Sequence, residues 1–330
     1  MSRINDSDNV KPRTFGKVAV LMGGWSAERA VSLRSGQAVL EALLRCGVDA
    51  HGIDVKKQTV LQDLENGEYD RAFIVLHGPG GEDGRIQAVL EILDMPYTGS
   101  DVLSSALGMD KLRSKMILEA AGLPTPDYMV LDDDTDPEYV VASLGLPLMV
   151  KPALEGSSIG MTRVDEPQQM REAYATAAQF AGAVIAERWI DGGEYTVTIL
   201  GEQALPVIKL ETPNAFYDYE AKYQSDQTRY LCPCGLDAEQ EGQLQRLALA
   251  AFKAVGARGW GRVDILCSDD GKPWVIELNT VPGMTDHSLV PMAAKAVGMD
   301  FDQLVYAILA QTLAGHDGNR QQGGNHVGTG

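Results

Sequence analysis

The chain has 330 residues, enough for two or three domains with a substantial buried core. Its formal net charge of −18 results from 28 basic and 46 acidic side chains. That balance argues against an extended nucleic-acid surface, because nucleic-acid phosphates require positive charge. No apolar run reaches the roughly 18 residues of a membrane span, and the first residues lack the apolar core of a signal peptide. Cys232-Pro-Cys234 could bind a metal, but no second Cys or His pair follows at a useful spacing, so a metal site is not favoured there. The composition fits a reducing cytoplasm.

Strands and helices are expected to alternate over the first hundred residues. The apolar runs Lys17–Met22 and Ala72–Leu76 each end at glycines, and a helical pattern follows each of them, the first from about Ala27 to Leu44. This alternation predicts a doubly wound parallel sheet, and ligand loops in such sheets lie at the carboxyl ends of the strands. Ser26 is a candidate N-cap of the first helix, and His77, at the end of the other strand, is expected to lie near a ligand.

The pattern changes after Gly122–Pro126, which has the composition of a joint between domains. Strands separated by single helices then predict an α+β body. The expected strands are Leu148–Pro152, Val184–Trp189, Tyr195–Leu200, Gly261–Cys267 and Trp274–Leu278, and the expected helix is Ala238–Val255.

Two acidic side chains interrupt the apolar strands near the C-terminal end of this body. Glu277 and Asn279 are two residues apart and therefore share a face of their strand. The Asp269-Asp270-Gly271 turn predicts a hairpin, and a register that places Asp264 on the same face would gather three oxygen ligands. Mg²⁺ prefers such ligands, and a buried carboxylate without a cation is costly. A solvated strand end is the alternative, and we favour the metal site.

The segment from Lys151 to Gly160 predicts a phosphate-binding turn. A lysine at a strand end is followed by Gly-Ser-Ser-Ile-Gly, whose backbone N–H groups can surround phosphate oxygens. A simple turn is the alternative, since the segment does not match the P-loop pattern. The polar and aromatic segment around Tyr217–Tyr223 lacks periodicity and predicts a lid loop.

Seven segments, in this order and spacing, resemble the D-alanine–D-alanine ligase family of the ATP-grasp superfamily: GGWSAER, LHGPGGEDG, MDKLRSK, VKPALEGSSIGM, FYDYEAKY, GWGRVDIL and ELNTVPGMTDHSL. The resemblance covers about residues 17–312. It implies an N-terminal α/β domain over 17–109, followed by an ATP-grasp fold with subdomains 110–193 and 194–312. Residues 1–16 and 313–330 are expected to be a flexible N-terminus and a disordered tail.

The same resemblance implies a role for each matching residue. Nucleotide binding would involve Lys111, Lys151, Ser157, Ser158, Glu187, Ile190, Glu194, Phe216, Lys222 and Leu266. Two Mg²⁺ or Mn²⁺ ions would be held by Asp264, Glu277 and Asn279. Substrate binding and catalysis would involve Glu28, His77, Ser157, Lys222, Tyr223, Arg262, Gly283, Ser288 and Leu289. Among these, Glu28 would receive the ammonium group of the first D-alanine, and Arg262 with Gly283 would stabilise the oxyanion.

The implied reaction joins two D-alanine molecules with ATP, through a D-alanyl phosphate, for peptidoglycan precursors and hence for the cell wall and cell shape. A cytoplasmic homodimer is what the resemblance suggests. Three alternatives stay open: an ATP-grasp ligase for another carboxylate and amine, a D-alanyl-D-lactate ligase, and a nucleotide-binding regulatory module without catalysis. The Glu-Ala-Lys-Tyr sequence ending at Tyr223 favours the dipeptide over D-alanyl-D-lactate. No expected acid or lysine is missing, which argues against a module without catalysis.

Overall fold

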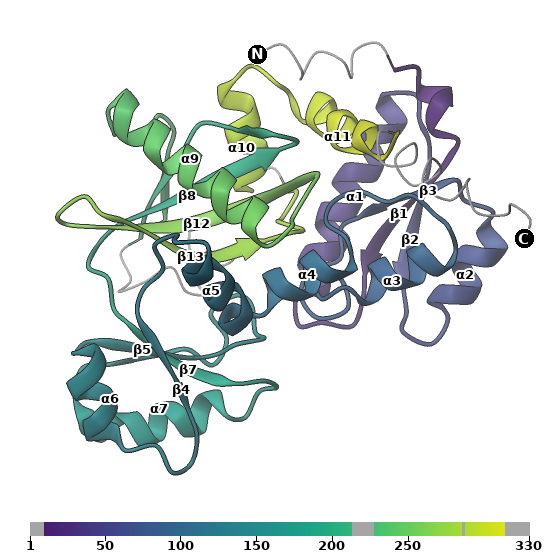
Figure 1. The fold of residues 1–330 in the computed structure, drawn as a ribbon. Helices are drawn as coiled ribbons and strands as arrows, with labels where there is room; N and C mark the ends of the chain where they lie inside the picture. Colours follow the sequence, from purple (N-terminus) through teal and green to yellow (C-terminus); the bar gives the residue numbers. More distant parts are fainter. Residues whose placement is uncertain (1–9, 213–227, 286–287, 314–330) are drawn as a thin grey trace, which may run out of the picture. The chain divides into compact units, whose positions relative to one another are not determined.

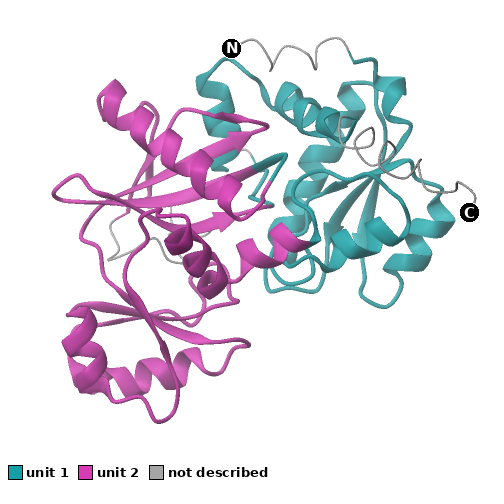
Figure 2. Cartoon of the chain, viewed as in Figure 1, with its two compact units in different colours: residues 1–102, 258–260, 281–330 teal, residues 103–257, 261–280 magenta. Residues whose placement is uncertain are grey.

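The computed structural model describes residues 10–212, 228–285 and 288–313. The chain divides into two compact units (Figure 2). Unit 1 consists of residues 1–102, 258–260 and 281–330, and unit 2 of residues 103–257 and 261–280. The finer boundaries expected at 109/110 and 193/194 stay a prediction.

Unit 1 contains a three-stranded parallel sheet with the strand order β2-β1-β3 (Figure 1). The connecting helices follow the strands in the order that the sequence predicts, so the expected α/β sheet is confirmed. The elements of this unit are β1 (Lys17–Gly23), α1 (Arg29–Arg45), β2 (Asp49–Val55), α2 (Val60–Gly67), β3 (Arg71–Ile74), α3 (Arg85–Ile92), α10 (Leu289–Ala296) and α11 (Phe301–Ala310), with 3-10 turns at Pro12–Phe15 and Gln311–Leu313.

Two expectations about the N-terminal region are corrected. Ser26 does not cap α1, whose N-cap residue is Glu28 without a side-chain cap. The Ser26 hydroxyl instead donates to the His77 carbonyl (2.7 Å) and accepts from the Glu28 N–H (3.2 Å), because it joins two strand-end loops. Within the expected flexible segment 1–16, Pro12–Phe15 form a 3-10 turn and Phe15 is fully buried, so flexibility is not supported there.

The first sheet of unit 2 is antiparallel, with the order β4-β7-β5-β6. Its apolar face packs against two amphipathic helices, and residues such as Val140, Leu148 and Ala173 form one core cluster. The elements are β4 (Tyr128–Leu131), α6 (Pro137–Leu144), β5 (Leu148–Pro152), β6 (Thr162–Val164), a 3-10 turn at Pro167–Gln169, α7 (Met170–Ala177) and β7 (Val184–Arg188).

The second sheet of unit 2 has the order β11-β10-β8-β12-β13, and β9 pairs with β8. The apolar faces of α5 and α9 contribute Leu118 and Phe252 to its core. The elements are α4 (Val102–Met109), α5 (Lys111–Ala120), β8 (Gly192–Leu200), β9 (Gln203–Ala204), β10 (Ile208–Glu211), β11 (Arg229–Leu231), α9 (Ala238–Ala254), β12 (Trp260–Ser268) and β13 (Pro273–Asn279).

The segment expected as a joint between domains, Gly122–Pro126, lies inside unit 2. Its backbone contacts β13, because the Val275 N–H donates to the Pro124 carbonyl at 2.9 Å. The segment therefore leads from α5 to β4 of the first sheet and packs against β13 at the edge of the second sheet.

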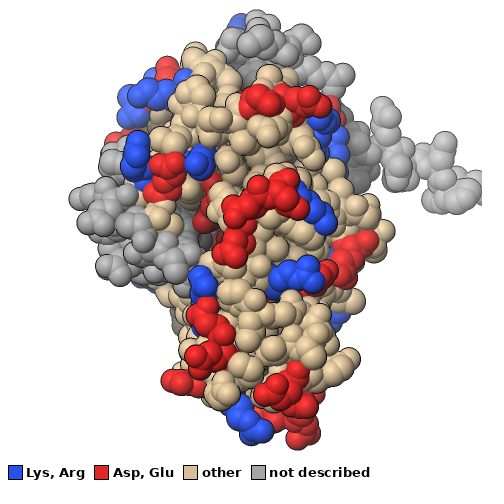
Figure 3. Space-filling view, turned by 90° about the vertical axis from the view of Figure 1, so that its left-hand side faces the viewer, with Lys and Arg blue, Asp and Glu red and all other residues tan. Residues whose placement is uncertain are grey.

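Charged side chains of both signs lie close together on the face drawn in Figure 3, which shows no extended basic patch among the described residues. Among the same residues, no helix combines the length and the apolar character needed to cross a membrane.

Candidate active site

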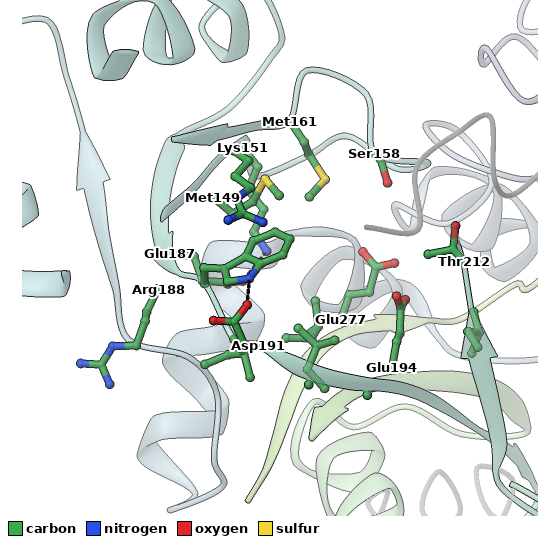
Figure 4. A pocket seen from close by; sticks show the side chains of 18 of the residues that line it. Met149, Lys151, Ser158, Met161, Glu187, Arg188, Asp191, Glu194, Thr212 and Glu277 are labelled. Carbon is green, nitrogen blue, oxygen red and sulfur yellow. Dashed lines mark hydrogen bonds and ion pairs between the residues drawn. The ribbon is translucent and has the colours of Figure 1, made fainter. Parts of the chain in front are cut away.

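Unit 2 contains a cavity of about 640 Å³ that opens between residues of its two sheets (Figure 4). Many of its lining residues are ones that the sequence singled out. These are Lys111, Lys151, Ser158, Glu187, Ile190, Glu194, Leu266 and Glu277. A nucleotide has the size and the mixed apolar and anionic character that such a lining suits.

The cavity has an apolar side that sequence reasoning missed. Met149 and Met161 point into it (Figure 4), and Trp189, Leu210 and Ile276 also line it. The Trp189 indole donates to Asp191 (2.8 Å), and the Arg163 guanidinium lies 4.5 Å from the indole ring centre. Single apolar residues on separate strands and loops carry no shared sequence signal, because only the folding of unit 2 brings them together.

Glu187, which lines this cavity, lies between two buried lysines. Its carboxylate contacts Lys151 (2.9 Å) and Lys115 (2.7 Å), and all three side chains are buried. Burial alone would raise the pKa of Glu187, but attraction from Lys115 and Lys151 outweighs it and lowers the pKa. The carboxylate is therefore ionised at neutral pH. Sequence reasoning missed Lys115, which occupies the interior of α5 in the MDKLRSK segment.

The expected phosphate-binding turn has an unusual backbone. Ser157 and Ser158 have φ angles of 52° and 60°, in the left-handed region that L-residues seldom occupy. Such strain is concentrated at ligand-binding turns. Ser158 lines the cavity, whereas Ser157 belongs to the same turn without lining it.

The register of the β12–β13 hairpin places the expected metal ligands on one face. Asp264 is opposite Glu277, and Arg262 is opposite Asn279. Directly opposed residues and residues two apart share a face, so these four side chains form one group. A register shift follows Asp264, and the sequence did not indicate it.

Asp264 accepts hydrogen bonds from three side chains. Arg262 donates to both carboxylate oxygens at 2.8 Å, Thr196 donates to Oδ1 at 2.7 Å, and Asn279 donates to Oδ2 at 3.1 Å. Glu277 pairs with Lys111 at 3.3 Å. Oxygen donors of this kind fit Mg²⁺ or Mn²⁺. The described residues contain no group of three His, Cys, Asp or Glu side chains that could hold a metal, but the expected set includes an amide.

In unit 1, the loop that carries Glu28 packs against the glycine loop after His77. A Cβ atom on Gly78, whose φ is 67°, would lie 2.9 Å from Oε2 of Glu28. A Cβ on Gly80 would lie 2.3 Å from the Trp25 ring. Glycine is therefore needed at both positions, and the bulky Trp25 is accommodated because Gly80 leaves room for it.

The buried His77 ring holds the segment that contains Gly283. Nδ1 lies 2.8 Å from the Val281 carbonyl, which can only accept, so we assign the proton to Nδ1. Nε2 then accepts from the Ser35 hydroxyl at 3.4 Å, and the oxygen of that hydroxyl accepts from the Met284 N–H at 3.1 Å. Sequence reasoning missed Ser35, which looks like an ordinary polar residue within a helical pattern.

Ser288 and Leu289 form the N-terminal end of α10. Because the Leu289 side chain is buried, only its backbone N–H is suited to binding a carboxylate, as helix N-termini commonly do. A Cβ on Gly283 would lie 3.0 Å from Oγ of Ser288, so these two residues are adjacent. Phe216, Lys222 and Tyr223 lie outside the described residues, as does most of the expected lid.

Two family models match this chain. The model described as "D-ala D-ala ligase N-terminus" matches residues 49–100, and "D-ala D-ala ligase C-terminus" matches residues 117–310. Similar curated proteins named D-alanine--D-alanine ligase include one from Nitrosococcus oceani, 59% identical over 92% of this chain and 96% of the relative. Another, from Acinetobacter baumannii, is 56% identical over 91% of this chain and 97% of the relative.

Solved structures agree with this assignment. A D-alanine--D-alanine ligase from Bacillus anthracis complexed with ATP is 32% identical, with a TM-score of 0.80 over 93% of this chain and 99% of its own. The VanG D-Ala:D-Ser ligase from Enterococcus faecalis is 31% identical, with a TM-score of 0.78 over 90% of this chain and 99% of its own. The ATP-grasp architecture and the resemblance found in the seven sequence motifs are thus confirmed. The chain belongs to the D-alanine–D-alanine ligase family.

Proposed function

We infer that this protein joins two D-alanine molecules into D-alanyl-D-alanine, with conversion of ATP to ADP and phosphate. The observation that carries this inference is the cavity of unit 2, where the lysines and acids of the family motifs line one space with an apolar side. Relatives that share more than half of their residues with this chain are named for the same reaction.

The chemistry requires activation of a carboxylate, because oxide is a very poor leaving group. A carboxylate oxygen of the first D-alanine attacks the γ-phosphorus, and ADP leaves. The amine of the second D-alanine then attacks the acyl carbon, an amide bond forms, and phosphate leaves with the original carboxylate oxygen. Positive charge near the phosphates and water exclusion near the acyl phosphate favour both steps.

Within unit 2, we assign the adenine and ribose to the region of Glu187, Ile190, Glu194 and Leu266, together with Phe216, which lies outside the described residues. Lys111 and Lys151 lie suitably for the phosphates, because both line the cavity. Ser157 and Ser158 would cover the phosphates with their backbone N–H groups.

Asp264, Glu277 and Asn279 would hold two divalent cations, which neutralise phosphate charge when bound. The Arg262 guanidinium is directed by Asp264 (2.8 Å), so Arg262 is fixed on the same face and suited to stabilising an oxyanion. The backbone N–H of Gly283 is the second donor of this proposal.

The amino-acid roles are assigned mainly to unit 1. Glu28 would bind the ammonium group of the first D-alanine, with His77 nearby in the same unit. Ser288 and the Leu289 N–H would bind the carboxylate of the second D-alanine, together with Lys222, and Tyr223 would join Ser157 and Glu28. We further propose a cytoplasmic homodimer that supplies peptidoglycan precursors.

An isotope experiment tests the reaction directly. The enzyme is mixed with ATP, Mg²⁺ and D-alanine labelled with ¹⁸O in the carboxylate, and the phosphate and dipeptide are analysed by mass spectrometry. One ¹⁸O atom in each phosphate released and stoichiometric D-alanyl-D-alanine are expected. Unlabelled phosphate would refute the acyl phosphate, and preferential use of D-serine or D-lactate as acceptor would assign a different product.

A further inference from the structure

Lys115 is a fully buried lysine without an assigned role in the reaction. It is 1% exposed and lies one helical turn after Lys111 on α5, so both lysines extend from the same face. Lys111 reaches Glu277 and the Glu155 carbonyl, at 3.3 and 2.7 Å. Lys115 extends instead toward Glu187 on β7 and, unlike Lys111, does not line the cavity.

The ammonium group of Lys115 has three oxygen partners. It donates to Oγ1 of Thr125 (2.7 Å) and to the Pro126 carbonyl (2.9 Å), and it pairs with Oε2 of Glu187 (2.7 Å). The Tyr128 ring centre lies 5.1 Å away and adds a cation–π contact. Because these contacts enclose its side chain, Lys115 is held in place and does not line the cavity.

The second partner of Lys115 is itself anchored. Thr125 accepts from Lys115 and donates to the Val275 carbonyl on β13 at 2.9 Å. Two residues further along β13 is Glu277, which lines the cavity. Lys115 therefore links Glu187 of the first sheet to the strand that carries Glu277 in the second.

Glu187 would behave differently without this cation. Its carboxylate is 4% exposed, and its other oxygen contacts Lys151. A buried carboxylate with too little positive charge takes up a proton or draws its remaining partner closer. Protonation would convert an acceptor into a donor, and a closer pair would withdraw Lys151 from the phosphates.

We propose that Lys115 is a positioning residue that keeps Glu187 ionised and aimed at the nucleotide base, and so sets the preference for adenine. An ionised carboxylate can only accept hydrogen bonds, so it favours a purine with an exocyclic amine over one with a carbonyl at that position. This inference rests on the proposed function, because it places the base beside Glu187.

The test compares ATP with ITP, which carries a carbonyl in place of the adenine amine. Lys115→Met should lower the ATP-to-ITP ratio of kcat/KM by about 10-fold, the order expected when a buried acceptor loses its counter-charge. Glu187→Gln should lower the ratio similarly. In Lys115→Met/Glu187→Gln, the ratio should equal that of Glu187→Gln alone, because Lys115 acts through Glu187. Lys253→Met on the exposed part of α9 is the matched control and should keep the parental ratio.

If Lys115→Met does not fold, the comparison is made between Glu187→Met and Lys115→Met/Glu187→Met, where the Lys115 charge is removed from an enzyme that already lacks the carboxylate. Equal ATP-to-ITP ratios of kcat/KM in these two variants support the proposal. A further loss on removing Lys115 from either Glu187 variant would overturn it, as would a parental ratio in folded Lys115→Met. A parental enzyme that makes no dipeptide from ATP and D-alanine would instead refute the proposed function.

Discussion

The hydroxyl of Thr196 offers a test of how the proposed metal ligand Asp264 is oriented. Thr196 and Thr198 lie two residues apart on β8, and each is 1% exposed. Thr196 donates to the buried Asp264 carboxylate at 2.7 Å, whereas among the described residues Oγ1 of Thr198 has no hydrogen-bond partner. Replacement of each by valine keeps the shape and removes only the hydroxyl.

Thr196→Val should cost about 1.5–3 kcal/mol, the usual contribution of a hydrogen bond to a charged group. Thr198→Val should be neutral or slightly stabilising, since removing an unpaired buried hydroxyl removes a desolvation cost. The melting temperature of Thr196→Val should therefore fall by about 3 °C or more relative to Thr198→Val.

The Mg²⁺ requirement should distinguish the same two variants. Because Asp264 loses a donor that orients it, the Mg²⁺ concentration for half-maximal turnover should rise by about 10-fold in Thr196→Val and stay unchanged in Thr198→Val. Differential scanning fluorimetry and Mg²⁺ titrations of phosphate release measure the two effects. Equal melting temperatures and equal Mg²⁺ requirements in the two variants would refute the reasoning.

Three further predictions concern the site and its core. Glu277→Gln should keep the fold but reduce turnover by about 100-fold or more, because the ligand charge is lost; near-parental phosphate release at ordinary Mg²⁺ would contradict the assignment. The lowered pKa of Glu187 predicts that the stability advantage of the parent over Glu187→Gln is complete above about pH 4.3 and lost as the pH falls through the folded-state pKa, which thermal melts across the acid range would show. Phe252→Ala should destabilise unit 2 by about 3–5 kcal/mol, because Phe252 is 1% exposed in the core of the second sheet; denaturant unfolding with a parental midpoint would exclude this.

Local patterns in the sequence determined much of the architecture and the shared face of several proposed site residues. The apolar run at Lys17–Met22 predicts β1, and the structure confirms it over Lys17–Gly23. The pair Glu277 and Asn279 was identifiable because strand periodicity alone places residues two apart on one face. The hairpin to Asp264 was identifiable because Asp269-Asp270-Gly271 is a strong turn signal.

Other features were decided only by tertiary structure. Lys115 could not be distinguished from its neighbours on α5, because its significance depends on Glu187, 72 positions later, and on Thr125. Met149 on β5 and Met161 just before β6 likewise gain a role only where the fold brings them to one cavity. Ser26 was misassigned as a cap because its hydroxyl donates a hydrogen bond to the carbonyl of His77, 51 positions away. Sequence periodicity reports which face of an element is buried, whereas the partner across that face is selected by packing between distant segments.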